Sequence, residues 1–350
     1  MKLPLKLNSN NDIYWNTNKF RSYGDTLNTL FSIGGRGIGK TTGVLIDIVN
    51  TYNRNGGQFV YIRRYKDEIA TFMEQSSIDT IIDGVKYRAF KGYYICSVGD
   101  DIIGYLLPLS IAKNFKSAGK FDRIRTIFFD EFTVDKSTFT HYLQNECNNF
   151  FNLVSSIVRT RTDYNLIFCG NNNDLFNPYY QLFNIPTFDS IYIDKKRGIM
   201  AEYPKNSPKL LEMEKQTPLY RLTQGTQFAR YHYENKYIES GDMGHVLTKK
   251  PNTYATFVKI VIHNMVLDVS FYDDPEDKKF KAYVSGKRGT ANGDNVFCLN
   301  DSKGNVNVFY LDYFRKRYKT YLYRLYYNDC VTYNSELTMN VFQQLMEDIK

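Results

Sequence analysis

The chain has 350 residues, a formal net charge of +8 and 43% hydrophobic residues. This length exceeds the usual limit of a single core and predicts two domains, and the apolar content excludes an intrinsically disordered chain. No apolar run approaches the ~20 residues that span a bilayer, and the first residues lack a signal-peptide core, so we expect no membrane partner. The five cysteines form no C-x-x-C pair, which indicates reduced thiols and no zinc site. The positive charge suits a polyanionic partner without identifying one.

A glycine-rich segment near the N-terminus has the form of a phosphate-binding loop. Its residues, Gly34-Gly35-Arg36-Gly37-Ile38-Gly39-Lys40-Thr41, match G-x-x-x-x-G-K-[ST] and lead into Thr42 at the start of a predicted helix. The apolar run before it predicts a strand, and this strand–loop–helix context favours a phosphate site over a simple glycine-rich turn. Backbone N–H groups and the positive helix end would surround an anion. We expect Lys40 to reach the β- and γ-phosphates and Thr41 to hold Mg²⁺.

A second apolar run, 124–129, predicts a strand that ends in Asp130 and Glu131. At this distance after a phosphate-binding loop the pair is typical of a Walker B strand, although exposed acids also end many ordinary strands. Asp130 is then expected in the magnesium shell, and Glu131 is expected to polarise the water that attacks the γ-phosphate. The second acid and the absence of an N-K-x-D element favour ATP over GTP as the nucleotide.

Further polar residues follow predicted elements of the same domain. Asn171 comes directly after the predicted strand 166–169 and is either a sensor of the γ-phosphate or a turn residue. Arg159 ends a predicted long helix, 137–159, and is either a cation that complements the helix C-terminus or an arginine finger for a neighbouring subunit. The cations of the segment 61–66 lie at a predicted strand end and are candidates for phosphate contact or for a solvated edge.

The first ~200 residues alternate strand-like runs with amphipathic helices, which is typical of an α/β fold with a mainly parallel sheet. A β-hairpin is expected from 93–98 and 102–107, and glycines and prolines around 195–218 indicate a connector. We therefore expect three parts: a P-loop ATPase domain at 1–208, a connector at 209–236 and a C-terminal domain at 237–350.

The last third of the chain predicts a small mixed or antiparallel sheet, followed by two helices with apolar stripes. The strand-like runs are 256–262, 265–271, 280–284 and 305–310. The first of the two helices carries Lys316, Arg317 and Lys319 among aromatic residues. This pattern fits contact with a nucleic-acid backbone as well as a solvated helix face.

Taken together, these segments resemble one family, the DNA-packaging (encapsidation) ATPases of small phi-29-type tailed phages, which are terminase-like P-loop motors of the ASCE class. The similar segments keep the same order over about the first 235 residues: GGRGIGKT, GGQFVYIRRYKDE, LLPLS, TIFFDEF, VRTR, CGNNN, FNPYY and RLTQGTQF. The segments IRRYK and FNPYY are more specific than the Walker motifs. The C-terminal third resembles the family only in length, basic character and alternating strands.

The resemblance implies a homo-oligomeric ring, typically a pentamer, that docks on the capsid portal (connector) and drives double-stranded DNA into a viral procapsid with ATP and Mg²⁺. It implies that Thr41 and Asp130 hold Mg²⁺, that Glu131 is catalytic and that Arg159 is a trans-acting finger. Lys116 falls near a second interface cation, in a register that needs a one-residue insertion. The implied place of work is the host cytoplasm, with transient docking on the procapsid and absence from the mature virion. The need for a packaging RNA stays open.

The implied C-terminal domain is a small α+β fold that resembles a vestigial RNase H-like nuclease. Asp268, Asp273, Asp274 and Asp312 lack the spacing of a two-metal nuclease, so no nuclease activity is expected. Two alternatives remain open: a P-loop helicase or replication ATPase that acts on nucleic acid, and a terminase with an active C-terminal nuclease. A nucleotide-binding scaffold without turnover is disfavoured, because such a site has little use for Glu131.

Overall fold

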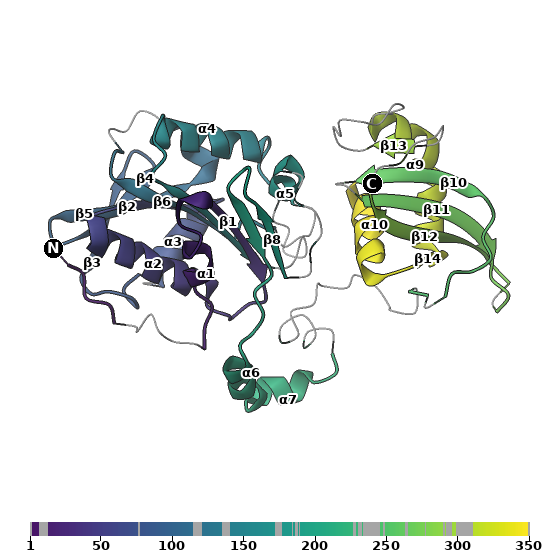
Figure 1. The fold of residues 1–350 in the computed structure, drawn as a ribbon, viewed down its shortest axis with the longest axis horizontal. Coiled ribbons are helices and arrows are strands. Elements are labelled where there is room, and N and C mark those ends of the chain that lie inside the picture. Colours follow the sequence, from purple (N-terminus) through teal and green to yellow (C-terminus); the bar gives the residue numbers. More distant parts are fainter. Residues whose placement is uncertain are drawn as a thin grey trace. The chain divides into compact units, whose positions relative to one another are not determined.

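The structure, a computed structural model, describes residues 2–6, 13–75, 78–114, 121–134, 141–171, 177–183, 190–226, 246–247, 249–262, 265–276, 278–289, 296–298 and 311–348, and the single residues 185, 188, 229, 233 and 291. It divides into two compact units that are interleaved along the chain (Figure 1). The first unit comprises residues 1–174 and 188–238, and the second comprises residues 175–187 and 239–350. The segment 209–236, which we expect as a connector, therefore falls within the first unit.

The first unit is built on a nine-stranded sheet in the order β3-β4-β5-β2-β6-β7-β1-β9-β8. Its strands are β1 (Thr29–Gly34), β2 (Gln58–Arg63), β3 (Val85–Phe90), β4 (Tyr93–Val98), β5 (Asp101–Pro108), β6 (Ile124–Asp130), β7 (Asn165–Asn171), β8 (Ile191–Asp194) and β9 (Ile199–Glu202). Six neighbouring strands, β5, β2, β6, β7, β1 and β9, run parallel. Antiparallel strands extend the sheet at both edges, β4 and β3 at one and β8 at the other. Because β7 separates β1 from β6, this is the strand order of an ASCE P-loop ATPase domain, as expected.

Helices cover both faces of this sheet (Figure 1). The helices α2 (Lys40–Asn55) and α3 (Lys66–Glu74) contact one face, and α4 (Glu146–Val158) lies on the other. The shorter elements are α1 (Asn18–Arg21), α6 (Pro208–Lys215), α7 (Pro218–Thr223) and the 3₁₀ helices η1 (Gly24–Thr26) and η2 (Leu109–Asn114). In the part of the chain that the structure describes, no helix has the length and apolar character needed to cross a membrane.

The two-residue period of the strands divides their side chains between the two helical layers. Leu30 and Ile167 belong to the core that α2 and α3 cover. Phe31 and Phe168, one residue further along, stack with ring centroids 4.4 Å apart, and Phe150 of α4 lies 5.0 Å from Phe168. Strands that are buried on both faces read as continuous apolar runs, which is why the sequence indicates them clearly.

The predicted helix 137–159 is wrong at its start. The helix α4 begins at Glu146, and residues 141–145 are not helical. Asn145, directly before the helix, has φ +54°, a left-handed conformation that asparagine tolerates better than most residues. The rest of the predicted extension, 137–140, lies outside the described residues.

The connector expected around 195–218 is also wrong in its first part. The strands β8 and β9 form an antiparallel hairpin, and β9 pairs in parallel with β1 in the main sheet. Gly198 has φ +69° at the end of the turn, a left-handed conformation that glycine adopts easily. The glycine is therefore part of a hairpin turn and not of a linker. The short helix expected at 210–214 is present as α6.

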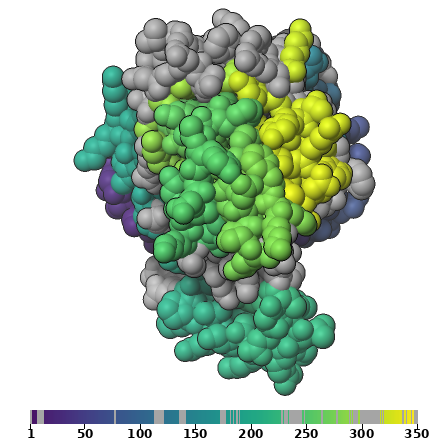
Figure 2. Space-filling model, turned by 90° about the vertical axis from the view of Figure 1, so that its right-hand side faces the viewer, coloured from purple at the N-terminus to yellow at the C-terminus, as the bar shows by residue number. Residues whose placement is uncertain are grey.

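The second unit contains a five-stranded sheet in the order β13-β10-β11-β12-β14. Its elements are α5 (Pro178–Phe183), β10 (Thr256–Ile262), β11 (Met265–Asp273), β12 (Phe280–Arg288), β13 (Val296–Cys298), α9 (Leu311–Tyr327), β14 (Val331–Tyr333) and α10 (Glu336–Asp348). Figure 2 shows the green strands 256–288 beside the yellow C-terminal helical region. The small mixed sheet and its two helices are confirmed; the run 305–310 lies outside the described residues, and the likeness to an RNase H-like nuclease stays a prediction.

Phe168→Ala tests the aromatic layer beneath α4. We expect the free energy of unfolding of the first unit to fall by about 3–5 kcal/mol, because a fully buried ring leaves a cavity that the β-sheet cannot close. Trp15, the single tryptophan, lies in the first unit, so its fluorescence in a urea titration reports on this unit. Leu222→Ala is the control, since Leu222 is 81% exposed and its loss should cost under about 0.5 kcal/mol. Equal effects of the two changes would contradict the expected packing.

Candidate nucleotide site

The glycine-rich loop joins the end of β1 to the start of α2. Gly37 has φ +81°, and Gly39, directly before the helix, has φ +87°. Both values lie in the left-handed region that residues with a Cβ rarely adopt, so glycine is required at these two positions. The loop therefore turns sharply enough to aim the first N–H groups of α2 into the space above the sheet.

Lys40 is the buried cation of the site. Its Nζ donates to the carbonyl oxygens of Gly34 at 3.0 Å and of Gly35 at 2.7 Å, and the residue is only 8% exposed. Burial lowers the pKa of Lys40 from 10.5 to about 8, although nearby acidic groups, among them Asp130 and Glu131, oppose this shift. The ammonium thus sits where an anion would compensate its lost hydration.

Asp130 joins three elements at the end of β6. The hydroxyl of Thr41 lies 3.1 Å from both carboxylate oxygens, and the hydroxyl of Tyr61 donates to Oδ2 at 3.0 Å. Burial raises the pKa of Asp130, while the guanidinium of Arg63 opposes this shift with Nη2 3.5 Å from Oδ2. A buried carboxylate beside a hydroxyl is a set of hard oxygen ligands, which fits Mg²⁺.

Glu131 follows at the turn, with a side chain that is 53% exposed. Its φ is +52°, an uncommon conformation for a residue other than glycine. Nη1 of Arg63 lies 2.5 Å from its Oε2, and Nε of Arg63 donates to the hydroxyl of Tyr61 at 2.8 Å. Arg63 therefore binds both acids of the Walker B pair. The sequence did not predict this role, because it left the cations of 61–66 as candidates for phosphate contact or for a solvated edge. The place of Arg63 at the end of a strand beside β6 is the signal that could have found it.

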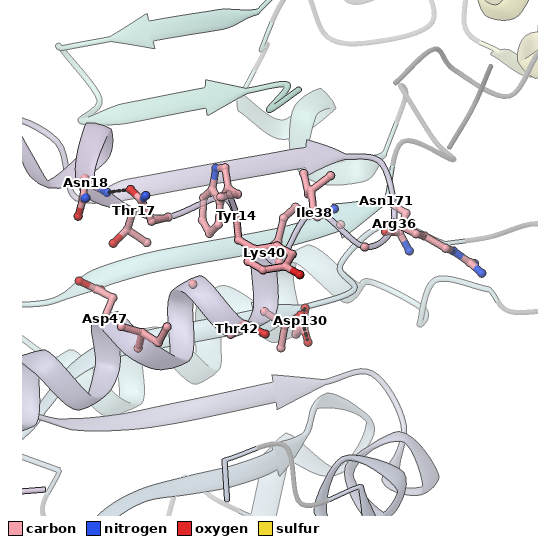
Figure 3. A pocket seen from close by; sticks show the side chains of 18 of the residues that line it. Tyr14, Thr17, Asn18, Arg36, Ile38, Lys40, Thr42, Asp47, Asp130 and Asn171 are labelled. Atoms are coloured by element: carbon pink, nitrogen blue, oxygen red, sulfur yellow. Dashed lines mark hydrogen bonds between the residues drawn. The ribbon is translucent and has the colours of Figure 1, made fainter. Parts of the chain in front are cut away.

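One pocket of about 1060 Å³ brings most of the predicted residues together (Figure 3). Its lining includes Arg36, Gly37, Ile38, Gly39, Lys40, Thr41, Thr42, Asp130, Glu131 and Asn171. Gly34 and Gly35 contribute the carbonyl groups that hold Lys40. The adjoining end of β7 places Asn171 at the pocket, half-buried, with its carbonyl oxygen accepting from the hydroxyl of Thr133 at 2.9 Å.

The opposite wall of the pocket is a segment that the sequence did not indicate, residues 14–18. The N–H of Trp15 donates to the carbonyl of Ile38 at 2.9 Å, and its Nε1 donates to Oε1 of Glu202 at 2.6 Å. A Cβ on Gly43 would lie 2.6 Å from the carbonyl oxygen of Trp15, so glycine in α2 allows this close approach. Tyr14 lies beside the loop, 41% exposed, and lines the pocket. These residues carry no motif, because the wall is made by contacts across the fold.

Arg159 does not line this pocket. It caps the C-terminus of α4, where its N–H donates to the carbonyl of Ser155 at 3.0 Å, and the residue is exposed with φ +52°. Lys116, the second interface candidate, lies outside the described residues.

The candidate residues of the second unit lie on α9 and on the sheet. Lys316, Arg317 and Lys319 share α9, Lys316 is exposed, and the structure does not describe the side chains of the other two. Asp268 lies between Lys259 at 3.9 Å and Lys287 at 3.4 Å. Asp274 pairs with Lys281 at 2.7 Å, and Asp273 accepts from the hydroxyl of Tyr254. Among the described residues, no group of three or more His, Cys, Asp or Glu is placed to hold a metal ion.

Known proteins resemble the chain over most of its length, and two of those described below cover nearly all of it. The DNA packaging protein of Bacillus phage PZA is 25% identical over 97% of this chain and 98% of its own length. The DNA packaging protein of Bacillus phage B103 is 28% identical over 69% of this chain and 73% of its own length. A chain of the bacteriophage Phi-29 viral genome packaging motor assembly has a TM-score of 0.59 and 22% identity, covering 97% of this chain and 100% of that one.

The family match agrees with these relatives and extends across both units. It covers residues 9–348 and thus includes the loop, the Walker B pair and the basic helix α9. The chain belongs to the family of podovirus DNA encapsidation proteins (Gp16).

Proposed function

We propose that this chain is the ATP-hydrolysing subunit of a ring motor that drives double-stranded DNA into a viral procapsid. One observation carries the proposal: Lys40, Thr41, Asp130 and Glu131 converge on one pocket in a member of the DNA encapsidation family. Nucleotide hydrolysis requires a cation for the phosphates, oxygen ligands for Mg²⁺ and a group that orients the attacking water, and these four residues supply all three.

The residues of the pocket divide the work of hydrolysis. Lys40 binds the β- and γ-phosphates, and Thr41 and Asp130 would hold Mg²⁺, which neutralises the phosphate charge when bound. Glu131 orients the attacking water and accepts its proton, and for this its carboxylate must be released from Arg63. Asn171, at the end of β7, contacts the γ-phosphate or the water.

Arg159 completes the site of a neighbouring subunit in this proposal. Its exposure at the end of α4, outside its own pocket, supports a role in trans. Such a guanidinium stabilises the negative charge that develops on the transferred phosphoryl group. Hydrolysis can then pass from one subunit to the next around a homo-oligomeric ring, for which we propose five copies.

The remaining partners follow from charge and from family membership. Lys316, Arg317 and Lys319 of α9 are proposed to contact the DNA backbone, whose phosphates attract lysine and arginine without regard to sequence. The motor works in the host cytoplasm, docks transiently on the procapsid portal and is absent from the mature virion. A packaging RNA is compatible with the positive charge of the chain.

A mixing experiment tests the shared site. Glu131→Gln should lower kcat at least ~100-fold, because it removes the base that orients the attacking water. Arg159→Ala should lower kcat by ~10³-fold or more, because it removes the cation that stabilises the charge on the transferred phosphoryl group. In an equimolar mixture, an Arg159→Ala subunit supplies an intact Glu131 to an interface where a Glu131→Gln subunit supplies Arg159. We therefore expect part of the DNA-stimulated ATP hydrolysis to return, measured as phosphate release.

Arg54→Ala is the matched control for this experiment, since Arg54 is an exposed cation in the last turn of α2. It should leave hydrolysis unchanged. An Arg159→Ala protein that retains full turnover, with no gain on mixing, would reduce Arg159 to a cation that complements a helix end.

The lowered pKa of Lys40 predicts that nucleotide binding takes up a proton. Without nucleotide, the Lys40 side chain has a pKa of about 8, so near pH 9 it is mostly the neutral amine. Bound polyphosphate favours the charged ammonium and so restores the proton. Affinity should fall as pH rises above 8, by up to about tenfold per pH unit. Calorimetric titrations at pH 9 in buffers of different ionisation enthalpy measure the proton count, which should be unchanged in the exposed control Lys209→Met. Binding without proton uptake at pH 9 would be inconsistent with this site for Lys40.

Tyr14 is expected to stack on the base of the nucleotide, because it forms the exposed aromatic part of the pocket wall. Tyr14→Ala should weaken ATP binding by about 1–3 kcal/mol, the usual worth of one base–aromatic contact. Binding of inorganic tripolyphosphate, which has no base, should be unchanged. Equal losses for both ligands would mean that Tyr14 supports the loop rather than the base.

A further inference from the structure

Two consecutive arginines at the end of β2 point to opposite faces of the sheet. Arg63 reaches Asp130 and Glu131 on the α2 side. Arg64 instead lies over the ring of Phe129, with its Cζ 5.6 Å from the ring centroid, on the side that α4 covers. This arginine is only 3% exposed and has no place in the pocket lining, so the catalytic scheme above does not use it.

The guanidinium of Arg64 forms a two-pronged ion pair with Glu146, the first residue of α4. Nε donates to Oε2 at 2.7 Å and Nη2 donates to Oε1 at 2.9 Å. Oε2 of Glu146 also accepts from the N–H of Leu143 at 2.8 Å. The side chains are 3% and 1% exposed, and Tyr142 covers the guanidinium with its ring centroid 5.1 Å from Cζ.

The remaining donors of Arg64 reach the turn that carries the catalytic acid. Nη1 donates to the carbonyl oxygen of Glu131 at 3.2 Å, and Nη2 donates to that of Phe132 at 2.7 Å. Glu131 holds the uncommon φ of +52° at this point. Such a conformation persists only where surrounding contacts impose it, and two charged hydrogen bonds to successive carbonyls are contacts of that kind.

Stability alone does not account for this arrangement. Burying two charges is costly, and an apolar pair of similar volume often packs as well or better. An apolar pair, however, has no donors for the carbonyls of Glu131 and Phe132. What the ion pair provides beyond packing is therefore the geometry of the turn.

We propose that Arg64 and Glu146 are positioning residues for ATP hydrolysis: Glu146 orients the guanidinium, and the guanidinium holds the backbone of Glu131 so that its carboxylate faces the γ-phosphate. The inference rests on the proposed ATPase activity. It assigns to the pair an effect on turnover and none on nucleotide binding, since neither residue lines the pocket.

Three variants test this role. Arg64→Lys keeps a charge for Glu146 but lacks the fork that spans two carbonyls. Glu146→Gln keeps the shape and loses the charge that orients Arg64. The double variant Arg64→Met/Glu146→Leu replaces the pair with apolar side chains that preserve packing and remove every donor to the turn. For each, kcat, the Kd of a fluorescent ATP analogue with Mg²⁺ and the unfolding temperature are measured on the full chain.

We expect kcat to fall at least tenfold in all three variants, with the nucleotide Kd within twofold of wild type. The double variant should keep a wild-type unfolding temperature and still fail to recover turnover. Lys281→Met is the control, because it breaks a partly buried ion pair with Asp274 in the second unit, with side chains 15% and 16% exposed, and it should leave kcat and Kd unchanged.

Two results would overturn the proposal. One is a double variant that hydrolyses ATP at the wild-type rate, since packing would then be sufficient. The other is loss of folding, or a parallel loss of nucleotide binding, in all three variants, which would assign the pair to holding the fold. A wild-type protein that binds nucleotide without hydrolysing it would instead defeat the proposed function, and the two failures are thus distinguishable.

Discussion

The buried carboxylate of Asp130 is the constraint on which the site depends. It is 2% exposed, and a carboxylate in such surroundings needs hydrogen-bonding or cationic partners. Those partners come from two other elements: Thr41 from α2, and Tyr61 and Arg63 from β2. Each element must be in place before the others can lower the cost of burying the charge, so the fold of the first unit and the geometry of its site form together.

The same turn also joins the two faces of the sheet. On one face Arg63 binds the acids of the Walker B pair, and on the other Arg64 connects the carbonyls of the turn to Glu146 at the start of α4. The helix that begins at Glu146 ends at Val158, directly before Arg159. A single helix thus links the turn of one site to the exposed arginine proposed to serve the neighbouring subunit.

Much of this could be predicted where the signal was local. The strand before the loop, the strand that ends in Asp130 and the hairpin β4–β5 are continuous apolar runs with clear turns, and the structure confirms them. The start of α4 was predicted too early because the apolar spacing continues on the N-terminal side of Asn145, whose left-handed backbone keeps the helix from beginning before Glu146. The hairpin β8–β9 was missed because a basic turn with glycine reads like a linker until its second strand pairs with β1.

The sequence by itself determined the phosphate-binding loop and the Walker B pair, since their chemistry depends on residue types at short spacing, and the order of similar segments determined the family. Only the tertiary structure decided which of the strand-end arginines faces the acids and which faces α4, because alternation along β2 has meaning only once both layers are packed. It also decided the wall at 14–18, where Trp15 meets Glu202 across 187 positions of the chain. Contacts between segments so far apart leave no periodic trace in either segment, so no reading of local pattern can find them.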